Sequence, residues 1–155
     1  MQTIKHLFVI MLVSIAIVSC SKDDDEPNNN IVARKGLPLS GDQEVPVRTT
    51  TASGTFDVSY DKTTRMLTYT VNWNGLSTNP TGSHIHGSAA RGANAGIKHD
   101  FFSLIPKTMS GTFTNSFMVD GVLVKEDSLL NGFYYMNFHT TTYPGGEIRG
   151  QIEFK

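Results

Sequence analysis

Alternation of apolar and polar residues with a period of two is the feature that most constrains the fold of this chain. Between residues 54 and 60, Gly, Phe, Val and Tyr alternate with Thr, Asp and Ser. Residues 67–73, 111–119 and 147–154 repeat the pattern. Successive side chains of a strand point to opposite faces, so each segment predicts a strand with one buried and one solvent-facing side. In the last segment, Glu147 and the polar residues that alternate with the isoleucines are expected on the solvent-facing side.

Turn signals separate the predicted strands. They are Asp61 to Thr64, Asn74-Gly75, Asn79-Pro80, Arg91-Gly92, Asn131-Gly132 and Pro144-Gly145-Gly146. Only residues 125–130 favour a helical turn. Seven to nine short strands connected in this way predict an all-β domain, an antiparallel Greek-key β-sandwich or barrel.

The N-terminus has the layout of a secretory signal that ends on cysteine. Residues 7–18 are nearly all aliphatic, and Cys20, the only cysteine of the chain, follows directly after Ser19. The apolar run is too short for a membrane span, which needs about 20 residues. The layout resembles a bacterial lipobox. The resemblance implies that residues 1–19 are removed and that Cys20 becomes the lipidated N-terminus.

Residues 21–30 read SKDDDEPNNN, a composition that cannot bury a core and predicts a solvated tether. An acidic run directly after a lipidated cysteine resembles the export signal of bacterial surface lipoproteins. The resemblance implies an outer-membrane protein that faces the cell exterior and contacts the membrane through its lipid. The predicted organisation is a signal peptide over 1–19, the lipidated cysteine and tether over 20–36, and one domain over 37–155.

The charge of the domain argues against a nucleic-acid partner. From residue 31 onward the chain has 11 basic and 10 acidic residues, and they form no basic stripe. The domain is also large enough to form a core without disulfide bonds.

Three segments together resemble the CHRD domain family. They are LSGDQEVP (residues 39–46), GSHIHG (82–87) and YMNFHTTTYPGGEIRGQI (135–152). The resemblance implies an immunoglobulin-like or superoxide-dismutase-like β-sandwich. The family has no established biochemical activity. The resemblance therefore favours a non-enzymatic binding or interaction module, with an extracellular protein or glycan as the unidentified ligand.

The histidines are the one group of residues in this sequence whose spacing suggests a chemical function. His84 and His86 are two residues apart, so on a strand both imidazoles project from the same face. His139 is expected on the solvent-facing side of a later strand, and Glu147 lies near it if residues 133–139 and 147–154 form a hairpin. Neutral imidazole is a good ligand for Zn²⁺ and Cu²⁺. The pattern predicts a zinc or copper site of His84, His86 and His139, with Glu147 as a candidate fourth ligand.

Two other interpretations of the histidines stay open. They can be structural, with His84 and His86 holding the glycine-rich loop 87–96 in place. They can also serve redox chemistry, since copper/zinc superoxide dismutase uses a His-x-His pair for part of its copper site. However, the other dismutase ligands and its cysteine pair are not found in this sequence. The sequence also shows no Ser–His–Asp arrangement at a nucleophile elbow, so no catalytic residue is assigned.

Overall fold

The computed structural model describes residues 30–155; the expected signal, Cys20 and the acidic run lie outside this range. Within it the chain forms one antiparallel sheet of eight strands. The strands are β1 (Ile31–Ser40), β2 (Ser53–Asp61), β3 (Met66–Asn74), β4 (Pro80–Gly87), β5 (Ile97–Asp100), β6 (Gly111–Met118), β7 (Tyr134–Thr140) and β8 (Ile148–Ile152). The helical segments are η1 (Gly41–Gln43), η2 (Phe102–Leu104) and α1 (Glu126–Leu130). The predictions of an all-β antiparallel domain and of a helical turn at residues 125–130 are confirmed, whereas η1 and η2 were not predicted.

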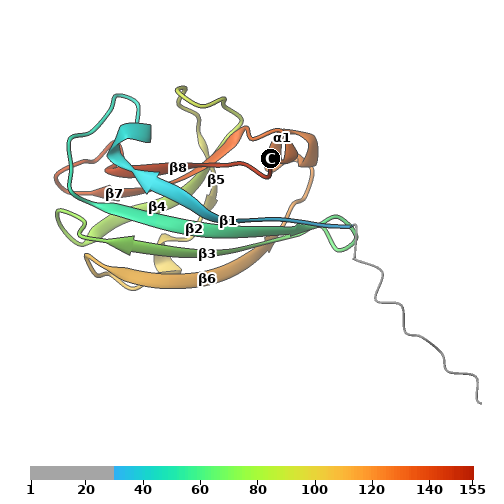
Figure 1. Ribbon diagram of the computed structural model, residues 1–155, viewed down its shortest axis with the longest axis horizontal. Coiled ribbons are helices and arrows are strands. Elements are labelled where there is room, and N and C mark those ends of the chain that lie inside the picture. The colour runs from blue at the N-terminus through green and yellow to red at the C-terminus, as the bar shows by residue number, and fades with distance from the viewer. Residues whose placement is uncertain (1–29) are drawn as a thin grey trace, which may run out of the picture.

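The sheet curls so that its two halves face each other. Its strand order is β5-β4-β7-β8-β1-β2-β3-β6, and the connections after β3, β5 and β6 cross between the halves, as in a Greek key. Figure 1 shows β2, β3 and β6 below the strands of the other half, with β1 rising from them toward β7 and β8. The halves are joined where Ser40 of β1 pairs with Arg149 of β8.

Apolar side chains from the two halves fill the space between them. Phe56, Tyr69 and Trp73 are at most 2% exposed, which confirms that they belong to the core. The rings of Trp73 and Phe138 lie 5.1 Å apart between centroids and join the two halves directly. The alternation in β2 and β3 therefore identified the buried face correctly.

The first strand begins earlier than the predicted boundary of the domain. Residues 31–34 pair with residues 58–61 of β2, so the sheet starts at Ile31 and includes residues assigned to the tether. This end of β1 reads Ile-Val-Ala-Arg, in which apolar and polar residues do not alternate, and all of its side chains except that of Val32 are exposed. The strand forms there because the backbone of β2 offers hydrogen-bonding partners, which the side-chain pattern does not report.

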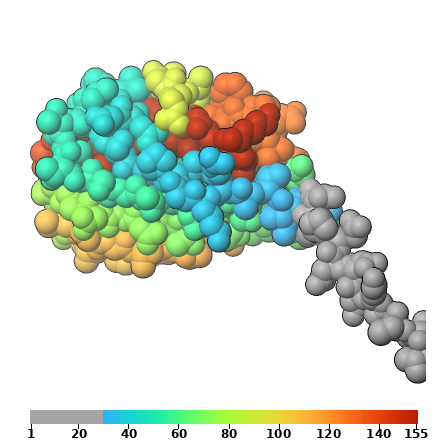
Figure 2. Space-filling model, in the orientation of Figure 1, coloured from blue at the N-terminus to red at the C-terminus, as the bar shows by residue number. Residues whose placement is uncertain are grey.

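The prediction that one face of β8 is in contact with solvent is wrong. Glu147 precedes this strand and is 0% exposed, and Arg149 and Gln151 are at most 2% exposed. Two loops, residues 41–52 and 88–96, lie over this outer face; Figure 2 shows them beside each other on the upper surface.

Hydrogen bonds hold the second of these loops against the sheet. A guanidinium nitrogen of Arg149 donates to the carbonyl of Ala93 at 2.8 Å, and the amide of Gln151 donates to the carbonyl of Ala89 at 3.0 Å. The side-chain amide of Asn94 donates to the carbonyl of Val45 at 2.9 Å and ties the two loops together. The outer face is therefore a second buried layer, built from polar groups.

None of the helices in residues 30–155 has the length and apolarity to cross a membrane.

Candidate metal centre

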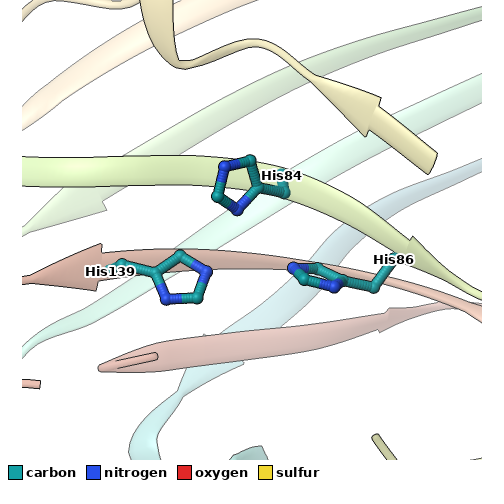
Figure 3. A group of neighbouring side chains, drawn as sticks. All are labelled: His84, His86 and His139. Atoms are coloured by element: carbon teal, nitrogen blue, oxygen red, sulfur yellow. The ribbon is translucent and has the colours of Figure 1, made fainter. Parts of the chain in front are cut away.

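Three histidines meet on the outer face, on the neighbouring strands β4 and β7. His84 and His86 come from β4, and His139 comes from β7, where it pairs with Gly82. One ligand nitrogen from each of the three rings lies within 4.8 Å of the others. Figure 3 shows each ring turning a nitrogen toward the space between them. The predicted convergence of His84, His86 and His139 is thus present.

Backbone carbonyls fix the tautomers of two of the rings. Nδ1 of His86 lies 2.9 Å from the carbonyl oxygen of Ala95, and Nδ1 of His139 lies 2.9 Å from that of Pro144. A carbonyl only accepts, so both Nδ1 atoms carry the proton and donate. Nε2 of each ring is then left with a free lone pair. Metal-binding histidines in proteins are usually held in this way, through the ring nitrogen that does not bind the metal.

His84 has no such carbonyl partner and lies near a carboxylate instead. Its Nε2 lies 3.9 Å from Oδ1 of Asp100 on the adjacent strand β5. The negative charge favours the proton on Nε2, and the lone pair is then on Nδ1.

In each of the three rings, the nitrogen that does not make one of these contacts has no hydrogen-bond partner. His84 Nδ1, His86 Nε2 and His139 Nε2 are buried and have no hydrogen-bond partner within residues 30–155. Three ring nitrogens with free lone pairs are therefore gathered within 4.8 Å of one another.

The electrostatics of the site keep the imidazoles neutral. Burial, with smaller contributions from His139 and His86, lowers the pKa of His84 to about 4, although Asp100 opposes the shift. Burial also lowers the pKa of His86 and of His139. Neutral imidazole is the form that coordinates metals, so no proton has to leave these rings at neutral pH.

Gly82 gives the rings room to approach each other. A Cβ at this position would lie 2.8 Å from Cε1 of His84 and 3.3 Å from Cδ2 of His139. Zinc bonds imidazole nitrogen at about 2.0–2.1 Å, which places two ligand nitrogens about 3.4 Å apart in a tetrahedral site. A glycine beside the rings allows them to close to that spacing.

Glu147 is not part of the cluster. Its carboxylate accepts hydrogen bonds from the hydroxyls of Thr50 at 2.7 Å and Thr140 at 2.8 Å, and from the hydroxyl and amide of Ser77 at 2.8 and 3.0 Å. The hairpin of β7 and β8 that was expected to bring Glu147 near His139 does form. However, the carboxylate accepts hydrogen bonds from three separate segments of the chain, so the role of Glu147 is to stabilise the fold.

His99 lies apart from the cluster. It stacks on Phe117 at 4.0 Å between ring centroids, and its Nε2 lies 3.4 Å from the hydroxyl of Tyr69. It belongs to the contact between the edge strands β5 and β6.

Two buried polar groups of the outer face were not assigned to the site from the sequence, although Asn137 was expected on the same face as His139. Glu44 is 3% exposed, and burial raises its pKa to about 7 although the nearby Arg149 opposes the shift. Asn137, also 3% exposed, pairs with His84 across β4 and β7. Its place two residues before His139 was the available signal for Asn137, whereas nothing in the sequence pointed to the burial of Glu44.

Comparison with known proteins identifies the family. The model of the CHRD domain matches residues 36–152, so this chain belongs to the CHRD domain family. The resemblance seen in the sequence is thereby confirmed. No curated protein and no solved structure matches the chain. Membership of the family supports a binding or interaction module in general terms and names no ligand.

Proposed function

We propose that this CHRD domain is a non-enzymatic binding module whose ligand is a transition-metal ion, Zn²⁺ or Cu²⁺, held by His84, His86 and His139. The observation that carries the proposal is the convergence of three buried, unpartnered imidazole nitrogens. A buried polar atom without a partner costs about 1–3 kcal/mol. The three unpaired nitrogens therefore destabilise the metal-free domain, and coordination of a metal ion would offset that cost.

A purely structural role does not account for these nitrogens. His86 and His139 already fix the neighbouring loops through Nδ1, by their bonds to Ala95 and Pro144. Such a role needs one nitrogen per ring and gives no reason for the second nitrogens to face one another. The metal-binding interpretation explains both sets of contacts, since one nitrogen orients the ring and the other binds the ion.

Calorimetric titration of the chelator-treated chain with Zn²⁺ and Cu²⁺ at neutral pH tests the proposal. His84→Ala and His139→Ala should each abolish binding, whereas His99→Ala, which removes an imidazole outside the cluster, should not. An ion in hundredfold excess over its dissociation constant should stabilise the wild type by about 2.7 kcal/mol. Binding no tighter than millimolar in the wild type would return the three histidines to a structural role.

We further propose that a lipid on Cys20 attaches the module to the outer membrane, on the face toward the cell exterior, where it can meet a protein or glycan partner. The apolar run that ends at Cys20 and the acidic run after it support this assignment. Cys20→Ala should block incorporation of a labelled fatty acid. Equal labelling of the wild type and the variant would refute the lipid anchor.

A further inference from the structure

The outer face contains one more buried polar side chain on the strands of the histidines, that of Asn137. This residue lies opposite His84 in the pairing of β4 and β7 and two residues before His139 on β7. Side chains two apart on a strand share a face, so Asn137 stands among the imidazoles. Its Oδ1 is buried and has no hydrogen-bond partner in the described part of the chain.

The other end of the amide determines which way this oxygen faces. Nδ2 of Asn137 donates to Oε1 of Glu44 at 3.4 Å. The nitrogen is thus directed at Glu44, and the carbonyl oxygen is directed away from it. Gly146 makes this contact possible, because a Cβ there would lie 2.2 Å from Oε1 of Glu44 and 2.9 Å from Nδ2 of Asn137.

The geometry points to Oδ1 of Asn137 as the fourth ligand of the metal held by His84, His86 and His139. This inference rests on the proposed function. Asn137 thereby takes the place of Glu147, which we predicted from the sequence as the fourth ligand. Four protein ligands close a tetrahedral site, whereas catalytic sites keep one position for water or substrate. A closed set of three nitrogens and one oxygen accordingly suits a module that binds its ion and performs no reaction at it.

Zinc titration of three variants tests the ligand. Asn137→Leu keeps the approximate shape of the side chain but removes the oxygen, and it should weaken Zn²⁺ binding at least tenfold. Asn137→Asp keeps an oxygen and should bind at least as tightly as the wild type. Asn115→Leu is the matched control on β6, where the amide contacts the hydroxyl of Tyr69, and its affinity should be unchanged.

Cobalt spectroscopy tests whether protein ligands fill all four positions of the metal site, and it can be done on the wild type alone. Co²⁺ in the wild-type site should show the intense visible bands of four-coordination, and added azide should leave them unchanged. In Asn137→Leu the same titration should shift the bands, because an open position accepts the anion. If the wild type binds no Zn²⁺, the proposed function fails and this inference fails with it. If the wild type binds Zn²⁺ but azide shifts its cobalt spectrum, or if Asn137→Leu binds Zn²⁺ as tightly, only the inference about Asn137 is overturned.

Discussion

Replacement of Glu147 by alanine should destabilise the domain strongly while leaving the metal site intact. The carboxylate is 0% exposed and accepts hydrogen bonds from Thr50, Ser77 and Thr140, which belong to three separate segments. Without it, these buried donors lose their acceptor and the segments lose their common anchor.

The size of the effect follows from the number and kind of these bonds. A hydrogen bond to a charged group contributes about 1.5–3 kcal/mol to stability. Burial of the carboxylate itself costs several kcal/mol, so the net contribution of Glu147 is smaller than the sum over its four donor groups. Removing the carboxylate leaves neutral buried donors without an acceptor, which costs about 1–3 kcal/mol for each donor that finds no other partner, and relief of the burial of the carboxylate offsets part of the sum, so we expect a net loss of about 3–5 kcal/mol. For a domain of this size, 1 kcal/mol corresponds to a shift in melting temperature of about 3–5 °C, so Glu147→Ala should melt about 10–20 °C below the wild type.

Thermal melts of the metal-free proteins measure this difference. Glu153→Ala is the matched control, because Glu153 is an acidic residue near the other end of β8 whose side chain is 40% exposed and pairs with Arg91 at 3.0 Å. An exposed pair of this kind contributes about 0–1 kcal/mol. Zn²⁺ affinity of folded Glu147→Ala should match that of the wild type. Equal melting temperatures for the two variants, or loss of zinc binding by Glu147→Ala in its folded form, would refute the reasoning.

Two further predictions concern the core and the pH dependence of stability. Val71→Asp should lower the free energy of unfolding by several kcal/mol, because Val71 is 0% exposed and the new charge has no partner. Thr70→Asp, on the opposite face of the strand, should cost far less. Equal urea midpoints for the two variants would show that the faces are misassigned. Glu44 has a pKa of about 7 in the folded state against an ordinary value of 4.5, so its protonated form favours the folded state. The free energy of unfolding should therefore fall by about 3 kcal/mol as the pH rises from about 4.5 to 7. Glu44→Gln should remove this loss, and a difference in unfolding free energy between wild type and variant that stays constant from pH 4.5 to 7 would contradict it.

The alternation of side chains was sufficient to determine the strands and the apolar core. In β3, Tyr69, Val71 and Trp73 alternate with polar residues, and this local pattern follows from strand geometry alone. The His-x-His spacing determined in the same way that His84 and His86 share a face. Family membership could be recognised from three short segments, because their order and spacing are properties of the sequence.

Only the tertiary structure decided which polar face is buried and which polar groups meet there. Alternation separates two faces of a strand, but it does not report that a loop from elsewhere in the chain covers one of them. For this reason Glu147 and Arg149 appeared to face solvent, while the fold buries both. Glu147 is occupied by residues as distant in sequence as Thr50, and the amide of Asn137 is oriented by Glu44, 93 positions away. Contacts of such range depend on how the sheet curls and its loops fold back, so the composition of the site follows from topology and not from spacing along the chain.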